Sequence, residues 1–251
     1  MSDTEEGNEE PQAITPKPPR AIEKTPMFTA MNAARYHRQM LIKDIESEHP
    51  KLLCYVAGNK ALVDRIDTLG VVDMLHNVTS GDPIDLLLHT PGGDVDAAEK
   101  LIGLVRSATG EEGQLRVIIP DYAKSAGTLM ALGANAIVMS DSSELGPIDP
   151  QVLSRDGNGS DVVYSVLTYL NAYDAARKAL RDAPDDLAAR ITFEKFDPTI
   201  VRKFQSVRDR ARSFAENLLK RRGKNFSKIT SELMDINKYQ SHGQMIGWET
   251  A

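Results

Sequence analysis

The sequence predicts an α/β fold in which helices cover a mostly parallel sheet on both faces. Four short apolar runs alternate with segments of helical periodicity, and each run is almost continuously apolar, at residues 52–57, 84–89, 115–119 and 136–139. Runs of this kind are typical of parallel strands that are buried on both faces. Active sites in such sheets form beyond the carboxyl ends of the strands, so we looked for reactive residues there.

Apolar residues at three- and four-residue spacing predict the helices. We expect them at residues 31–48, 60–69, 95–107 and 125–134, with a further amphipathic segment at 163–173. A longer helix is expected to begin at Pro198, with Asp197 as its N-cap and Gly223 as its stop. These elements divide the chain into an α/β core at 28–160 and a helical C-terminal extension of the same domain at 161–251.

The first 27 residues are polar and rich in proline. A stretch of this composition buries too little apolar area to offset the entropy lost on ordering, so residues 1–27 are expected to form a disordered polar tail. They lack the basic start and apolar stretch of a secretory signal, and no apolar run in the chain reaches the 18 residues or more expected of a membrane span. We therefore expect a soluble, cytoplasmic protein.

Composition excludes several kinds of function. The net charge of −6 and the pI near 5.5 argue against nucleic acid as a partner. Cys54 is the single cysteine and lies in an apolar run, so an intrachain disulfide is impossible. The five histidines show no metal-ligand spacing, and we expect neither a metal nor a cofactor.

The first candidate motif joins a buried strand to a helix and reads Thr90-Pro91-Gly92-Gly93-Asp94. Two glycines allow the backbone to turn with free N–H groups facing outward, which is the arrangement that stabilises an oxyanion. Pro91 would line the substrate cleft beside them. The same residues would equally serve as a plain strand-to-helix turn capped by Asp94.

The second motif also lies between a strand and a helix, and it contains Ser125 within Ala123-Lys124-Ser125-Ala126-Gly127-Thr128. A serine at this junction exposes its hydroxyl, and the helix N-terminus lies beside any negative charge that forms. The small residues Ala126 and Gly127 would let a substrate backbone approach. The alternative is that Ser125 only caps the helix.

The third motif, Glu144-Leu145-Gly146-Pro147-Ile148-Asp149-Pro150, follows the fourth strand. Its glycine and prolines predict a rigid loop near the same strand ends. Either Glu144 or Asp149 would orient a base or line the substrate cleft, unless the segment is only a structural turn.

In their order and spacing, these three motifs resemble those of the Clp protease/crotonase superfamily over residues 50–152. The runs 123–128 and 145–151 closely resemble the serine dehydrogenase proteinase family, which is related to the signal peptide peptidase A-type peptidases. The resemblance implies that Ser125 is the nucleophile of a serine peptidase. It implies that the backbone around Gly92 and Gly93, with the N–H of Ala126, forms the oxyanion hole. It also implies a homo-oligomer that acts on peptides or unfolded segments.

The general base is not settled by the sequence. Clp proteases carry a histidine about two dozen residues after the serine, where this chain has Asp149, so a Clp-type triad is contradicted. Lys178 lies at about the distance at which signal peptide peptidase A-type enzymes place their lysine base, but a catalytic lysine must be largely neutral. His242 is the rival base, because a histidine needs little tuning of its pKa. His89, at the end of a strand, would also reach the site.

Ten lysines and arginines fall in residues 202–228, which form a basic helix region. We expect a solvated face there, or else a docking surface for another subunit, an acidic partner or an anionic membrane. Two further functions stay open at this point: a crotonase-type enzyme acting on an acyl-CoA thioester, with Glu144 or Asp149 as acid/base, and a non-catalytic scaffold with the same fold.

Overall fold

The computed structural model describes residues 24–111, 113–155, 159–220 and 225–251. It divides into two units, Met1–Asp44 and Ile45–Ala251. The predicted core boundary at residue 28 is therefore too early. Residues 1–23 of the predicted tail lie outside the described residues, but the tail prediction extends too far, because Thr25 caps a helix, α1, at Pro26–Met31.

The first unit consists of α1 and most of α2 (Ala33–Glu46), and α2 lies within the predicted helix at 31–48. Neither helix has a buried residue. Apolar side chains such as those of Met31 and Met40 are exposed.

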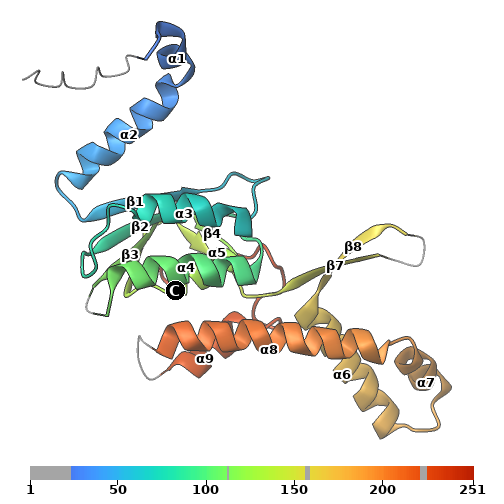
Figure 1. Ribbon diagram of the computed structural model, residues 1–251. Coiled ribbons are helices and arrows are strands. Elements are labelled where there is room, and N and C mark those ends of the chain that lie inside the picture. The colour runs from blue at the N-terminus through green and yellow to red at the C-terminus, as the bar shows by residue number, and fades with distance from the viewer. Residues whose placement is uncertain (1–23, 112, 156–158, 221–224) are drawn as a thin grey trace, which may run out of the picture. The chain divides into compact units, whose positions relative to one another are not determined.

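The main sheet of the second unit has four parallel strands in the order β1-β2-β3-β5 (Figure 1). They are β1 (Lys51–Val56), β2 (Ile84–His89), β3 (Leu115–Ile119) and β5 (Ala136–Met139), and the last three coincide with the predicted runs. The central strands β2 and β3 contribute most to the core, since Ile84, Leu88 and Leu115 are fully buried. The predicted α/β class with a parallel sheet is confirmed.

Three helical elements connect these strands. The predicted helix at 60–69 is displaced, because Asp64 caps a short 3-10 helix, η1 (Arg65–Asp67), which leads into α3 (Thr68–Leu75). The helices α4 (Val95–Thr109) and α5 (Ala126–Leu132) lie close to the predicted positions. All seven residues of α5 are buried, so its small side chains allow the tight packing that the sequence indicated.

Two small sheets were not predicted from the sequence. The two-residue strands β4 (Tyr122–Ala123), β6 (Glu144–Leu145) and β9 (Ile246–Gly247) form one of them, and β9 pairs with β6 antiparallel. The other is a hairpin of β7 (Gln151–Arg155) and β8 (Asp161–Ser165). The predicted boundary between core and extension, at 160/161, falls inside this hairpin.

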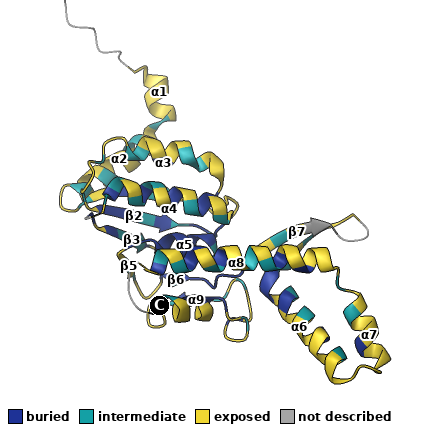
Figure 2. Ribbon diagram, turned by 60° about the horizontal axis from the view of Figure 1, so that its bottom comes forward, coloured by how far each residue is buried: buried dark blue, intermediate teal, exposed yellow. Residues whose placement is uncertain are grey.

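The C-terminal extension contains four helices, α6 (Val166–Asp182), α7 (Leu187–Glu194), α8 (Pro198–Lys220) and α9 (Phe226–Leu233). Val166, Leu170, Val201 and Phe204 form a second apolar cluster between α6 and α8. Figure 2 shows this buried stripe beside the largely exposed outer faces of α6 and α7.

Two details of this extension differ from the prediction. Val163 belongs to β8 rather than to a helix. The basic region 202–228 is not one helix, because α8 ends at Lys220 and α9 starts at Phe226; the predicted stop at Gly223 lies outside the described residues. Across the described part of the chain, no helix is both long enough and apolar enough to cross a membrane.

Candidate active site

Ser125 lies between β4 and the first turn of α5 in a strained backbone conformation. Its φ is 50° and its ψ −114°, and it is the one non-glycine residue with positive φ in the described part of the chain. Conformations of this kind cost on the order of 1–3 kcal/mol and concentrate at functional sites. The side chain makes no capping hydrogen bond to α5. The alternative that Ser125 only caps the helix is therefore excluded.

Gly92 brings the strand-to-helix turn against this serine. Its φ is +107°, and a Cβ at this position would lie 2.8 Å from the carbonyl oxygen of Lys124 and 2.9 Å from Cβ of Ser125. Gly93, with φ +154°, packs equally closely on Val63, where a Cβ would lie 2.4 Å from the backbone nitrogen. Both glycines are therefore required by close backbone approach and by their φ.

Two backbone amides near Ser125 remain available to a ligand. The N–H of Gly92 donates to Oγ1 of Thr90 over 3.1 Å, so this amide is already used. Among the described residues, no acceptor is hydrogen-bonded to the N–H of Gly93 or of Ala126. Of the three residues expected at the oxyanion hole, Gly93 and Ala126 thus keep a free donor, and Gly92 serves as a packing residue.

A groove of about 1100 Å³ contains Ser125 and Gly93. Pro91 lines it as predicted, while the opposite walls come from the β7–β8 hairpin and from α8. The hairpin contributes Val152, Leu153 and Val163, and α8 contributes Lys203, Ser206, Val207, Arg210 and Ala211. Sequence reasoning missed both walls, because neither the hairpin nor the direction of α8 has a local signature.

Gly127 does not line the groove, which corrects the prediction for the substrate cleft. It is buried in α5, and a Cβ there would lie 2.5 Å from Cγ2 of Thr90. Its role is therefore the close packing of α5 against the end of β2.

His242 also lines the groove, and Asp149 lies behind it. The Nδ1 atom of His242 is 3.6 Å from Oδ2 of Asp149, and their side chains are 30% and 11% exposed. This Nδ1 atom is buried without a hydrogen-bond partner in the described residues. Oδ1 of Asp149 accepts a hydrogen bond of 2.8 Å from Oγ of Ser165, which fixes the carboxylate. Asp149, predicted to line the cleft or orient a base, is thus positioned for the second role.

The ammonium group of Lys124 holds the loop that carries His242. It lies 2.7 Å from Oε2 of Glu144 and donates to the carbonyl oxygens of Leu145, Gly243 and Gln244 at 3.2, 3.4 and 3.3 Å. The Lys124 side chain is only 13% exposed. Because Lys124 directly precedes Ser125, the segment that carries the serine also contacts the loop that carries His242. The sequence offered no signal for this contact.

Two other candidate bases lie elsewhere. Lys178 is exposed on α6 and is not among the residues that line the groove. Nδ1 of His89 is 3.0 Å from the carbonyl oxygen of Ala57, and its ring packs on that of Tyr122, with centroids 4.1 Å apart. His89 is therefore a packed residue that does not line the groove. Within the described residues, no cluster of three or more potential metal ligands occurs.

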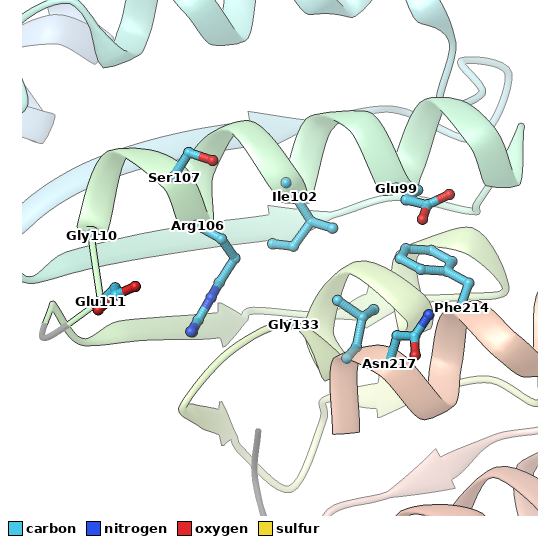
Figure 3. A pocket seen from close by; sticks show the side chains of 11 residues that line it. Glu99, Ile102, Arg106, Ser107, Gly110, Glu111, Gly133, Phe214 and Asn217 are labelled. Atoms are coloured by element: carbon cyan, nitrogen blue, oxygen red, sulfur yellow. The ribbon is translucent and has the colours of Figure 1, made fainter. Parts of the chain in front are cut away.

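A second pocket, of about 530 Å³, lies between α4 and the C-terminal half of α8 (Figure 3). Ile102 and Phe214 form an apolar side, and Glu99 and Arg106 reach it from α4. Neither Ser125 nor His242 lines it. The groove is therefore the candidate active site.

Residues 62–186 match the family model of the ClpP-like SDH-type serine proteinases. This match confirms the resemblance drawn from the residues around Ser125. Two uncharacterized proteins of Methanocaldococcus jannaschii are 49% and 43% identical to this chain over 70 residues, which is 28% of this chain and 23% of the length of either relative.

Two solved structures of the 1510-N membrane-bound stomatin-specific protease also resemble the chain. One is a mutant in complex with a substrate peptide, with TM-score 0.43 and 16% identity, and it is matched over 74% of this chain and 64% of its own. The other is a second mutant, with TM-score 0.47 and 17% identity, matched over 79% of this chain and 74% of its own.

Proposed function

We propose that the chain is a serine peptidase with the hydroxyl of Ser125 as its nucleophile, because residues 62–186 belong to the ClpP-like SDH-type serine proteinase family. The observation that carries the proposal is the strained backbone of Ser125, at φ 50°, beside the free amides of Gly93 and Ala126 in one groove. Acyl transfer requires a nucleophile that the substrate can reach and unused donors where the negative charge develops, and backbone strain of this kind concentrates at functional sites.

In this mechanism, the Ser125 hydroxyl oxygen attacks the carbonyl carbon of a peptide while its proton passes to His242. The oxyanion that forms accepts hydrogen bonds from the N–H groups of Gly93 and Ala126. Collapse of this intermediate breaks the C–N bond, and the amine leaves with the proton from His242. Water then hydrolyses the acyl-enzyme with His242 as base again, and Ser125 regains its proton.

His242 is the base that the geometry supports best. It lines the same groove as Ser125, and Asp149 faces its Nδ1 atom at 3.6 Å, which leaves Nε2 as the nitrogen for proton transfer. This separation is too long for a hydrogen bond. Such contacts are often long in an empty site and shorten when the substrate binds. Lys178 remains the competing base, and its exposed position on α6 gives it no comparable support.

Fluorophosphonate labelling of the full chain tests the proposal. We expect the wild type to be labelled, Ser125→Ala to lose the label completely, and His242→Ala to be labelled far more slowly. Lys178→Ala should be labelled like the wild type. An unlabelled but folded wild type would exclude the serine-hydrolase mechanism, and binding of acyl-CoA by that protein would then favour the crotonase-type function.

Two accompanying proposals are a homo-oligomer, which the family match supports, and a cytoplasmic location, for which the sequence composition is the support. Ile66, Leu69 and Val72 are exposed apolar residues at three-residue spacing on η1 and α3, a surface that a second copy would cover. Light scattering after size exclusion tests the assembly, and cell fractionation tests the location.

A further inference from the structure

The wall of the groove formed by α8 includes a lysine that pairs with no acidic residue of the described part of the chain. Lys203, Ser206, Val207 and Arg210 line the groove from successive turns of this helix. Arg210 is neutralised, because it pairs with Asp96 over 3.3 Å and also with Glu99. Lys203 is exposed, and among the described residues it has no ion-pair partner. Its ammonium group is therefore available to a ligand.

The two acidic residues of the groove are already engaged. Oδ1 of Asp94 accepts a hydrogen bond of 2.6 Å from the N–H of Ala97, as the N-cap of α4. Asp96 lies between Arg210 and Arg65, whose guanidinium is 4.0 Å away. Neither carboxylate pairs with Lys203, so its ammonium group is the cation of the groove that has no acidic partner among the described residues.

The wall opposite α8 is apolar and exposed. Leu153 and Val163 on the β7–β8 hairpin are 64% and 56% exposed, and Leu62 beside Gly93 is 64% exposed. Apolar side chains that stay exposed along a concave surface indicate a binding site for apolar groups. An occupant that matches both walls has apolar side chains on one side and a carboxylate on the other.

On the basis of the proposed function, we infer that Lys203 is a specificity residue, which selects peptide segments carrying apolar side chains and a carboxylate. That carboxylate belongs either to an aspartate or glutamate side chain or to a peptide C-terminus, since both present the same group to an ammonium. Arg202 is the matched control, because it is a neighbouring exposed cation on α8 that does not line the groove.

Peptide binding to the Ser125→Ala chain tests this inference without requiring catalysis. The probes are fluorescein-labelled decapeptides of leucine, alanine and serine, in which one glutamate or glutamine occupies each position in turn. One further pair carries a free or an amidated C-terminus. Fluorescence anisotropy at low salt gives Kd for each peptide.

At one or two positions, we expect glutamate to bind about two- to fivefold more tightly than glutamine, as for a solvent-exposed charge pair. A preference for the free over the amidated C-terminus would instead identify a terminal carboxylate as the ligand. Lys203→Glu should reverse the preference, so that glutamine binds more tightly than glutamate at those positions, and Arg202→Glu should leave it unchanged. Only a direct contact with the ligand predicts this reversal.

Equal Kd values for every glutamate and glutamine pair and for both C-termini would overturn the inference. So would failure of every peptide to bind, or an equal effect of the two charge reversals. Labelling of Ser125 in the wild type reports separately on the proposed function. If the peptides show the charge preference but Ser125 is not labelled in the wild type, the groove binds peptides without hydrolysing them.

Discussion

The Nδ1 atom of His242 lies 3.6 Å from Oδ2 of Asp149, although the two residues are far apart in the sequence. Asp149 occupies the distance after Ser125 at which Clp proteases place their histidine. The carboxylate thus lies behind a histidine supplied by a C-terminal loop. Serine, histidine and aspartate therefore lie at one groove, with the histidine supplied by a C-terminal loop and the aspartate by the segment after the fourth strand of the main sheet.

The first prediction concerns this pair. We expect His242→Ala to reduce kcat for a fluorogenic peptide by about 100- to 10,000-fold, the range of general-base catalysis. Asp149→Asn should also lower kcat, because the carboxylate no longer stabilises the imidazolium. Lys178→Ala should leave kcat unchanged. If instead Lys178→Ala alone were inactive, the base would be the lysine.

A second prediction uses the contact between Gly92 and the serine. Gly92→Ala should disrupt the site and destabilise the fold, since its Cβ would lie 2.8 Å from the backbone oxygen of Lys124 and φ is +107°. Gly70→Ala in α3 is the control, because nothing lies within 4 Å of its Cβ. We expect this control to raise the free energy of unfolding by about 0.4–1 kcal/mol. Urea unfolding and fluorophosphonate labelling measure both effects.

The backbone strain at Ser125 gives a third prediction. Ser125→Ala and Ser125→Gly both remove the nucleophile, but only glycine tolerates φ 50° and ψ −114° without strain. The glycine variant should therefore be more stable than the alanine variant by about 1 kcal/mol. Thermal or urea unfolding of the two inactive proteins compares them directly. Alanine at equal or higher stability would show that the site imposes no strain.

Lys124 is expected to act as a positioning residue for His242. Lys124→Met removes the ammonium from Glu144 and from the carbonyl oxygens of Gly243 and Gln244, so the histidine loop loses its anchor. We expect kcat to fall by up to about 100-fold with little change in KM. In the double variant Lys124→Met with Glu144→Gln, no uncompensated carboxylate remains, so part of the lost stability should be recovered. The lost kcat should not be recovered. Recovery of both would indicate a purely structural role.

A fifth prediction concerns pH and the start of α8. The backbone N–H groups of Thr199 and Ile200 hold the pKa of the Asp197 carboxyl below its ordinary value. The folded pKa is below the unfolded one, so the charge stabilises the fold above the unfolded pKa, about 3.9. This contribution is lost as pH falls through the folded pKa. The Tm difference between wild type and Asp197→Asn should therefore shrink below about pH 4.

The sheet and the serine could be predicted from local sequence, for a physical reason. Parallel strands buried on both faces are nearly continuous apolar runs, and three of the four had their observed bounds. Gly92, Gly93 and Ser125 follow those runs directly. Hydrophobic periodicity cannot be recognised in very short strands, such as those of the β7–β8 hairpin and the two-residue strands β4, β6 and β9. Their positions depend on tertiary contacts, as does the contact of Lys124 with the histidine loop.

The antiparallel pairing of β9 with β6 has a consequence for the order in which the protein acquires activity during synthesis. The ribosome releases Ser125 and both free amides long before it releases His242 and the strand at Ile246–Gly247 that fixes the loop. A nascent chain would therefore expose a serine without its proton acceptor. With His242 as the proposed base, we expect no hydrolysis of neighbouring nascent polypeptides until this strand has emerged and paired. Labelling of ribosome-bound chains that a C-terminal linker holds with residue 247 either inside or outside the exit tunnel would detect the onset, and equal labelling of both would contradict it.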